Sequence, residues 1–581
     1  MESCSSALSR AFLPGASHRR RSPAALPRGF YRNRFSSLLS FTEESYAPPA
    51  LSDVASTKET KGRPWSWFLC DILGDAVDNH FTRFPLHPSV DPALVLVGNF
   101  APVDELPPTP CRIVKGSIPG CLRGGAYIRN GPNPRQYPFG PYHLFDGDGM
   151  LHSLLLPRNG TDRSHAVLCS RYCRTSAPVI SKTFGLRGLG GVARVVIALI
   201  KILAGQMDPI EGMGPANTSV SFFWDNIFVL GETDQPFTVY LSPEDGDLLS
   251  TERRDLGGKL VKGGSVHHKQ DPVTGELFAV NYSLVPPFLT YYCFDSSGNE
   301  KLEVPIASVL QPSIFHDFAV TKHYAIFPET QLVMDPLGMA FCDGSFIRCD
   351  TRKTSRVGVL SRYAASGSEI TWFDVPGFNP LHICNAWEEG DDGGVVVLVG
   401  SSSVNLQHFV ERMELVDGHI EMVRIDLKTS IVSRTLLSVM SLGFGGVNPT
   451  YQGRKSRYAY AAIAGCTPKI RGVAKLDLEL AAQKRDCVVV RREFGPGCYC
   501  GEPFFVPKGE GKDLDEDDGY LLTFVHDENE EKSKFVVMDA KSTELEVIAE
   551  VELPRRVPYG FHGVFVSQSD LKRQRRHKGL D

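Results

Sequence analysis

Histidine is the residue type through which this sequence offers chemistry, and two histidines stand side by side in the stretch S-V-H-H-K-Q-D-P at residues 265–272. A neutral imidazole is a common metal ligand, and near pH 7 it also exchanges protons. Successive side chains of an extended strand point to opposite faces, so His267 and His268 cannot both serve one centre. We therefore expect one of them to face a site and the other to face away from it.

The sequence contains no short catalytic motif. It has no HExxH zinc motif, no GxSxG nucleophile elbow and no phosphate-binding loop. Any catalysis must use dispersed residues, and the 16 histidines are the available candidates. A Ser-His-Asp set could be assembled from so many histidines and serines, so that possibility carries little information.

Composition indicates a folded protein without a bias toward nucleic acid. The 581 residues are 42% hydrophobic and 22% charged, with a formal net charge of -5. Nucleic-acid-binding proteins usually present a basic surface, so no nucleic-acid partner is expected. The 14 cysteines are scattered without a CxxC pair, which is typical of isolated thiols in a reducing compartment.

The N-terminal segment differs from the rest of the chain. The first 42 residues hold seven arginines, nine serines and a single acid, Glu2. This composition is typical of an organelle transit peptide, whereas a secretory signal would need an uninterrupted apolar run. We predict a disordered transit peptide over 1–45 and a helical segment over 46–94, and a disordered basic tail is the alternative for 1–45.

Short apolar runs recur between turn residues from about residue 95 onward. Examples are L-F-A-V-N-Y, G-G-V-V-V-L-V-G and G-Y-L-L-T-F-V-H-D, which are rich in strand-forming residues and bounded by Gly, Pro, Asp and Asn. Many short strands over roughly 480 residues exceed one sandwich and predict a β-propeller with blades of about 70 residues. The main domain is expected to span 95–581.

Two stretches look helical, 64–81 and 186–204. In the second, Arg187, Arg194 and Lys201 recur every seven residues and form a cationic stripe beside a wide apolar face. Three charges argue against a transmembrane span, and the pattern fits a helix that lies on a membrane surface. A buried helix with snorkelling basic side chains is the alternative.

Four histidine-containing segments resemble those of the carotenoid cleavage dioxygenases, non-haem iron oxygenases that cut polyene chains. They are H-H-K-Q-D-P (267–272), F-H-D-F-A-V-T (315–321), L-H-I-C-N-A-W-E-E (381–389) and V-P-Y-G-F-H-G (557–563). Other matching segments are Y-I-R-N-G-P-N-P (127–134), F-D-G-D-G-M-L-H (145–152), A-N-T-S-V (216–220), L-G-E-T-D (230–234) and G-P-G-C-Y-C-G-E-P-F-F-V-P (495–507). The resemblance covers about residues 95–567, with the segments in the family's order.

The resemblance implies an all-β fold, a seven-bladed β-propeller with a helical cap over a hydrophobic tunnel and a helical insertion around 186–207. It implies one Fe(II) per subunit, no organic cofactor and no catalytic residue beyond the metal ligands, which would be His267, His316, His382 and His562. Four neutral imidazoles leave the charge of Fe(II) uncompensated and leave positions open for O2. The implied reaction is cleavage of a carotenoid or apocarotenoid double bond by O2, which gives two carbonyl products.

Carboxylates usually orient metal-bound histidines by accepting their second N–H. By resemblance, acids serve three of the four ligands, and Glu232 and Glu502 match two of them. The third position, before the Phe of S-L-G-F-G-G-V-N-P, holds Gly443, and no acid lies between Asp426 and Asp477. Weaker iron retention or slower turnover is therefore expected, rather than loss of activity.

Other candidate residues are expected to be structural. Asp-Gly pairs favour tight turns, so Asp146 and Asp148, together with nearby His152, are assigned to the fold, as are Glu388 and Glu389. Relatives place a proline directly after the first ligand. The resemblance therefore makes His267 the ligand and puts His268 in the proline position, facing away from the metal.

The implied substrate is nearly insoluble in water, so the enzyme must take it from a lipid surface. Segments 186–204 and 64–81 are the expected contact with a membrane or plastoglobule, in the chloroplast stroma of a plastid. The segments G-P-G-C-Y-C-G-E-P-F-F-V and N-P-T-Y most resemble the plastoglobule-type and zaxinone-synthase-like groups. Two alternatives stay open: a polyene isomerase that uses the same iron, and a non-catalytic carotenoid-binding propeller, which only Gly443 supports.

Overall fold

The computed structural model describes most of residues 85–575. The gaps are 139, 159–164, 174–215, 233–235, 254–265, 336–337, 339–345, 391–392, 411, 466–467, 510 and 512–513. The chain divides into two compact units, Met1–Arg63 and Pro64–Asp581, and all described residues belong to the second. The predicted transit peptide and both predicted amphipathic segments lie outside the described residues.

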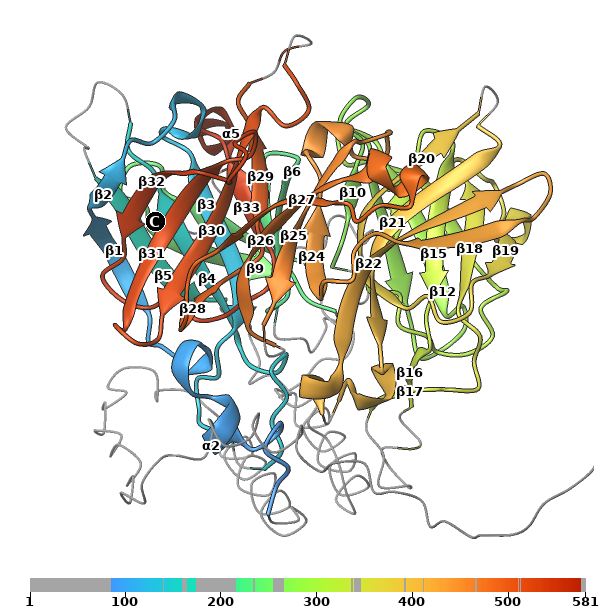
Figure 1. The fold of residues 1–581 in the computed structure, drawn as a ribbon, viewed down its shortest axis with the longest axis horizontal. Coiled ribbons are helices and arrows are strands. Elements are labelled where there is room, and N and C mark those ends of the chain that lie inside the picture. Colours follow the sequence, from blue (N-terminus) through green and yellow to red (C-terminus); the bar gives the residue numbers. More distant parts are fainter. Residues whose placement is uncertain are drawn as a thin grey trace, which may run out of the picture. The chain divides into compact units, whose positions relative to one another are not determined.

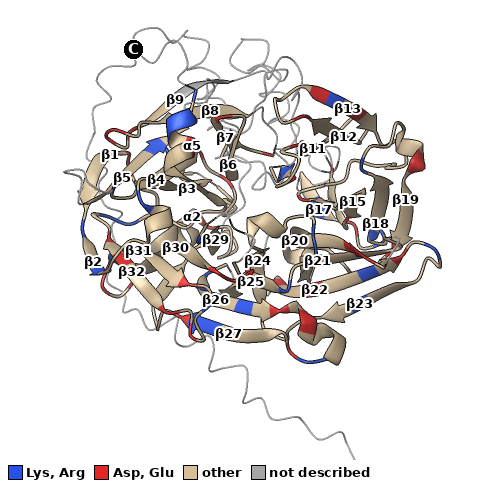
Figure 2. Ribbon diagram, turned by 90° about the horizontal axis from the view of Figure 1, so that it is seen from above, with Lys and Arg blue, Asp and Glu red and all other residues tan. Residues whose placement is uncertain are grey.

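The prediction of an all-β propeller is confirmed. Seven sheets are arranged as blades around a common centre, seen end-on in Figure 2, and an eighth sheet is a small hairpin. Four blades consist of four consecutive antiparallel strands. They are β6 (Ser219–Phe223), β7 (Asn226–Leu230), β8 (Phe237–Leu241) and β9 (Leu248–Arg253); β10 (Lys269–Gln270), β11 (Leu277–Tyr282), β12 (Leu289–Phe294) and β13 (Glu300–Pro305); β20 (Pro380–Glu389), β21 (Val395–Val404), β22 (Asp417–Asp426) and β23 (Val432–Leu436); and β24 (Leu442–Gly446), β25 (Tyr458–Ala464), β26 (Ile470–Asp477) and β27 (Val488–Glu493).

The fifth blade carries an insertion. Its strands, in spatial order, are β14 (Ala319–Val320), β15 (Tyr324–Glu329), β18 (Arg356–Ser361) and β19 (Thr371–Asp374). Between β15 and β18 the chain forms the separate hairpin of β16 (Leu332–Met334) and β17 (Ile347–Cys349).

The two remaining blades join both ends of the domain. One has the order β1 (Leu106–Cys111), β5 (Ala166–Tyr172), β4 (Gly149–Leu155), β3 (Ala126–Pro132) and β33 (Gly563–Val566). The other has the order β2 (Ile113–Gly116), β32 (Val547–Glu552), β31 (Lys532–Asp539), β30 (Gly519–Asp527) and β28 (Cys498–Cys500), and β29 (Phe504–Pro507) also pairs with β30. N-terminal and C-terminal strands thus pair in two blades and close the ring. Figure 1 shows the blue N-terminal strands beside the red C-terminal ones.

Helices are few and short among the described residues. The α-helices are α2 (Pro92–Val95) and α5 (Gln568–Arg573), and the 3-10 turns are η1 (Gly98–Phe100), η2 (Gly120–Leu122), η3 (Gly367–Glu369), η4 (Leu406–His408), η5 (Met413–Leu415), η6 (Pro449–Tyr451) and η7 (Leu478–Gln483). None of the helices within the described part of the chain has the length and apolarity needed to cross a membrane.

Packing between neighbouring blades explains the apolar runs. Strands β4 and β7 are buried along their whole length, whereas β27 at the rim alternates between half-buried and exposed residues. Phe278 and Tyr291 of one blade pack with Phe318 and Phe327 near the next, and the rings of Tyr291 and Phe327 are 5.6 Å apart. Each such buried ring stabilises the fold by roughly 1.5–3 kcal/mol relative to an exposed one.

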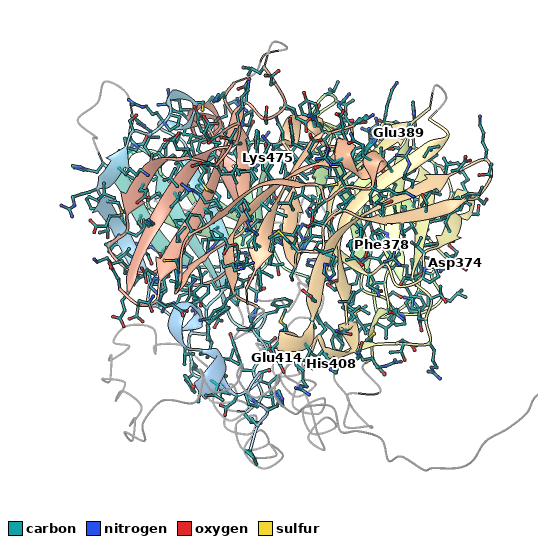
Figure 3. All side chains as sticks on the ribbon, in the orientation of Figure 1. Asp374, Phe378, Glu389, His408, Glu414 and Lys475 are labelled. Atoms are coloured by element: carbon teal, nitrogen blue, oxygen red, sulfur yellow. The ribbon has the colours of Figure 1, made fainter. Side chains whose placement is uncertain are left out.

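The two ends of the ring differ. Strand β20 contains His382 near its start and ends at Glu389. Figure 3 shows Glu389 at one end of the blades and His408 and Glu414, from the loop after β21, at the opposite end. We call the end with Glu414 the site end and the end with Glu389 the far end.

Candidate metal centre

Four histidines from four blades meet on the axis of the ring. Each stands just before or near the start of an innermost strand: His267 before β10, His316 before β14, His382 in β20 and His562 before β33. One ring nitrogen from each lies within 4.8 Å of the others. These are the four histidines that the sequence selected, and the fold brings them all together.

The nitrogen spacing fits a single metal ion. His316 Nε2 lies 3.2 Å from His267 Nε2 and 3.3 Å from His382 Nε2. Two nitrogens bound to one ion at about 2.1 Å and at a right angle are about 3 Å apart. No described carboxylate or thiol joins the four nitrogens in this group, so the donor set is composed of imidazoles alone.

The pKa shifts of two of these histidines suit metal binding. Burial lowers the pKa of His267 and of His382 well below its usual range, and the neighbouring histidines lower it further. Both rings are therefore neutral at pH 7, which is the form that donates a lone pair to a metal. Burial also acts to lower the pKa of His316, but the Glu232 carboxylate outweighs it and raises that pKa overall.

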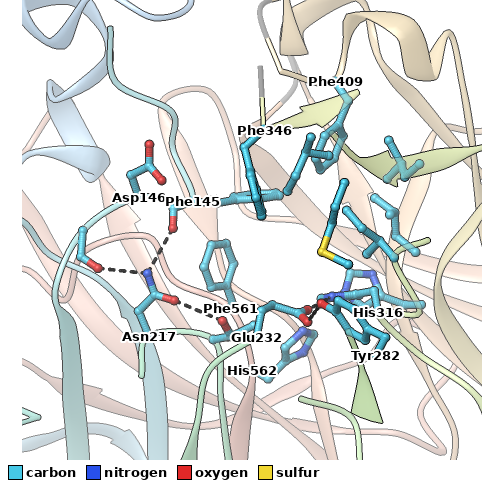
Figure 4. Close-up of a pocket in the computed structure, with 18 of the residues that line it drawn as sticks. Phe145, Asp146, Asn217, Glu232, Tyr282, His316, Phe346, Phe409, Phe561 and His562 are labelled. Atoms are coloured by element: carbon cyan, nitrogen blue, oxygen red, sulfur yellow. Dashed lines mark hydrogen bonds and ion pairs between the residues drawn. The ribbon is translucent and has the colours of Figure 1, made fainter. Parts of the chain in front are cut away.

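Carboxylates from other blades fix the orientation of two of the rings. His316 Nδ1 donates to Glu232 Oε1, and His562 Nδ1 lies 3.1 and 3.0 Å from the two oxygens of Glu502. With Nδ1 engaged, Nε2 of each ring is left to face the centre. The buried Tyr282 hydroxyl donates to Glu232 Oε2, a contact that sequence reasoning did not predict. Figure 4 shows Glu232 between Tyr282 and His316.

His382 has a different environment. Among the described residues, none gives its Nδ1 a hydrogen-bond partner; its ring packs instead against Phe444, with the ring centroids 5.0 Å apart. A Cβ added at Gly443 would have Ser401 Oγ, 3.9 Å away, as its nearest neighbour. The first carbon of a side chain at position 443 would therefore meet no close contact.

An apolar cavity adjoins the histidines (Figure 4), and Phe409, from the loop after β21, is among its lining residues. His316, His382 and His562 contribute to its wall, and the other lining residues are mostly apolar. Among them are Phe145, Leu332, Met334, Phe346, Phe409 and Phe561. Such a cavity suits a long apolar molecule, since apolar walls exclude water while one polar point orients the ligand.

The F-D-G-D-G-M-L-H segment forms part of this wall. The Asn217 amide of A-N-T-S-V donates to the carbonyl oxygens of Phe145 and Gly147, at 3.0 and 2.9 Å. Asp146 also lines the cavity, which an Asp-Gly turn pattern does not predict. Asp148 accepts the backbone N–H of Arg135 at 3.0 Å, so this carboxylate makes a turn contact.

The remaining candidate residues make hydrogen bonds away from the four histidines. His152 Nδ1 lies 2.9 Å from Ser170 Oγ on the paired strand. Glu388 accepts the backbone N–H of His323 at 2.7 Å, and Glu389 accepts the indole N–H of Trp387 at 3.1 Å.

His268 is turned away from the other histidines. Its ring packs near Phe223, with the centroids 5.7 Å apart, and its buried Nδ1 has no hydrogen-bond partner among the described residues. Burial lowers its pKa to about 4, so the ring is neutral. His267 therefore faces the other three histidines and His268 faces away from them, as the alternation of side chains along a strand predicts.

Known proteins are similar to this chain in sequence and in fold. Residues 100–567 match the family RPE65, described as retinal pigment epithelial membrane protein. The chain is 51% identical over 516 residues to 9-cis-epoxycarotenoid dioxygenase NCED1, chloroplastic, of Oryza sativa subsp. japonica, covering 87% of this chain and 81% of the relative. It is also 51% identical over 512 residues to the probable carotenoid cleavage dioxygenase 4, chloroplastic, of Arabidopsis thaliana, covering 86% of this chain and 84% of the relative.

Solved structures agree with this relationship. Cobalt-substituted Synechocystis ACO matches with a TM-score of 0.65 at 26% identity, over 82% of this chain and 99% of that one. Pseudomonas brassicacearum lignostilbene dioxygenase shares the fold, with a TM-score of 0.67 at 20% identity over 84% of this chain and 100% of that one. With the family matched over most of its length, this chain belongs to the RPE65 and carotenoid cleavage dioxygenase family.

Proposed function

We propose that this protein is a non-haem iron(II) dioxygenase that cleaves one double bond of a carotenoid or apocarotenoid with O2 and releases two carbonyl products. The observation that carries the proposal is the convergence of four imidazoles, three of which line an apolar cavity. Relatives 51% identical to this chain are named as carotenoid dioxygenases, and this supports the same class of reaction.

His267, His316, His382 and His562 would hold one iron ion per subunit. Imidazole donors suit Fe(II), and a set with no anionic ligand leaves the charge of the ion available to a further ligand. The bound iron would supply the activation of O2. Glu232 and Glu502 would orient His316 and His562 through their Nδ1 atoms, and Tyr282 would hold Glu232 in place.

The apolar cavity would bind the polyene and select the bond to be cut. Its phenylalanine, leucine and methionine side chains can contact an apolar chain along its length, and they exclude water from the reacting atoms. The register of the substrate against these walls would decide which double bond lies beside the histidines. The chain needs no organic cofactor for these roles.

The names of close relatives place them in the chloroplast, and this protein is assigned to the plastid accordingly. Within the plastid, we propose that it works at a membrane or plastoglobule surface through 186–204 and 64–81. Residues 1–45 would act as the transit peptide, before a helical segment over 46–94 and the dioxygenase domain over 95–581.

Membership of the plastoglobule-type or zaxinone-synthase-like subgroup is part of the proposal. The motifs G-P-G-C-Y-C-G-E-P-F-F-V and N-P-T-Y support it. Overall identity does not separate the candidates, because the relatives named NCED1 and carotenoid cleavage dioxygenase 4 are both 51% identical to this chain.

Product analysis tests the reaction. Iron-loaded protein incubated in air with a panel of carotenoids and apocarotenoids is expected to yield pairs of carbonyl fragments, identified by mass spectrometry, and 18O2 should label the products. The same panel under argon is the control. A geometric isomer of the substrate would instead indicate an isomerase, and unchanged substrate in every case would indicate a binding protein; either outcome contradicts the proposal.

The paired histidines give a second test. His267→Ala should abolish iron binding and turnover, because it removes one of the four ligands. His268→Pro should leave both within about twofold of wild type, since the His268 backbone N–H donates to no described residue and the His268 Nδ1 atom that is lost has no partner among them. Iron content and turnover of the two purified variants decide the matter. Loss of iron in His268→Pro, with retention in His267→Ala, would reverse the assignment.

Gly443 gives a third test. Gly443→Glu should raise iron affinity or turnover by up to about tenfold, because loss of an orienting carboxylate at a metal site typically lowers either by 10–100-fold. A Cβ added at Gly443 has no neighbour nearer than Ser401 Oγ, at 3.9 Å. Gly443→Gln has the same shape without the charge and is the matched control. If the folded Gly443→Glu protein equals Gly443→Gln in both measurements, the missing acid has no bearing on the centre.

The membrane segment gives a fourth test. Ile197→Asp combined with Ile200→Asp should reduce sedimentation with plastid-lipid vesicles at least fivefold while activity in detergent micelles is retained, because charge opposes burial among lipid chains. Ile431→Asp, at a 66% exposed residue in the turn between β22 and β23, is the control. Equal loss of activity in vesicles and in micelles would argue against a role in lipid contact.

A further inference from the structure

A buried ion pair lies behind the candidate metal centre, on the side away from the apolar cavity. Lys269 Nζ lies 2.7 Å from Asp317 Oδ1, and the two side chains are 11% and 3% exposed. Both residues line a second and more polar cavity that His267, His382 and His562 also border, and neither lines the apolar cavity. The pair therefore has no contact with a molecule bound in the apolar cavity.

The Asp317 carboxylate connects three of the four ligand-bearing strands. It follows His316 directly, and its Oδ1 atom accepts the backbone N–H of Phe318 at 2.8 Å. Its Oδ2 atom accepts the backbone N–H of Ile383 at 2.7 Å. Lys269, the third partner, stands in β10.

Each of these contacts lies next to a proposed ligand in the sequence. Ile383 directly follows His382, Asp317 directly follows His316, and Lys269 is two residues after His267. A buried carboxylate is retained only where charge and hydrogen bonds compensate for lost hydration, and here the compensation comes from the backbones and side chains beside three ligands. We propose that Lys269 and Asp317 are positioning residues that set the spacing of His267, His316 and His382 for metal binding.

Positioning by Lys269 and Asp317 is important at His382 in particular. Glu232 and Glu502 orient His316 and His562 through their rings, whereas among the described residues no carboxylate reaches the His382 ring. The bond from Ile383 to Asp317 fixes the backbone beside His382. The ion pair thus restrains through the main chain a ligand whose ring no described carboxylate orients.

A positioning role and a purely electrostatic role of the ion pair predict opposite changes in the metal affinity of Lys269→Met. Lys269→Met leaves the Asp317 carboxylate unpaired near a bound cation, so charge alone would strengthen metal binding. Loss of positioning would instead weaken it. In the double variant Lys269→Met, Asp317→Asn the site carries the same net charge as the wild type, so charge alone predicts wild-type affinity.

The inference rests on the proposed metal centre, and the experiment uses Fe(II) and the spectroscopic probe Co(II) with the whole protein. We expect Lys269→Met and the double variant to bind either metal about 10–100-fold more weakly than wild type. We also expect the visible ligand-field bands of the Co(II) form to shift, because the nitrogen geometry changes. Gly443→Glu introduced into Lys269→Met should restore part of the affinity.

The control is a buried ion pair of similar geometry in the β15 blade. Lys353 Nζ lies 2.9 Å from Glu329 Oε1, and the side chains are 10% and 2% exposed. Lys353→Met should lower the unfolding midpoint of the metal-free protein as Lys269→Met does, while metal affinity and the Co(II) spectrum stay as in wild type.

Two results would overturn the proposal. One is a Lys269→Met protein that binds metal as tightly as wild type, or more tightly, with an unchanged Co(II) spectrum. The other is the same spectral shift in Lys353→Met, which would assign the effect to general loss of stability. Failure of the wild-type protein to bind any metal would refute the proposed centre itself, a result distinct from both.

Discussion

Four histidine ring nitrogens occupy one small volume, and the rest of the structure is arranged to put them there. His316 Nε2 lies 3.2 and 3.3 Å from the Nε2 atoms of His267 and His382, and the fold must hold these polar groups together until a cation is bound. The propeller does this by starting innermost strands of different blades around one axis. Closure of the ring through β33 and β2 makes this arrangement a property of the whole domain.

The charged side chains near the centre contact the histidine ligands or their neighbours in sequence and do not point into the centre itself. Glu232 and Glu502 act through ring N–H groups, and the Tyr282 hydroxyl takes part of the hydrogen-bonding capacity of Glu232. Lys269 and Asp317 cancel each other at 2.7 Å. The four histidines would hold a divalent ion without an anionic ligand, so the charge of the ion would remain available to activate a further ligand.

The fold class was predictable because burial on both faces of a blade leaves continuous apolar runs, and L-F-A-V-N-Y became β11 in this way. The four histidines followed from motif resemblance, and strand alternation separated His267 from His268. The pairing of β3 with β33 could not be predicted, because the two strands are far apart in the sequence and no local sequence pattern reveals such a contact. Tyr282 and Lys269 were missed for the same reason, because each acts through a contact with a distant part of the chain.

His382 shows that two ways of orienting a ligand can be separated. Phe444 has a φ of +48°, unfavourable for a bulky residue, and its ring centroid lies 5.0 Å from that of His382 and 5.7 Å from that of His562. Packing of this kind restrains the tilt of an imidazole but accepts no proton from it. A carboxylate would also raise the basicity of the coordinating nitrogen. With Gly443 in place of an acid, His382 is held by shape and by its backbone, so it should be a weaker donor than His316 and His562, whose rings contact carboxylates.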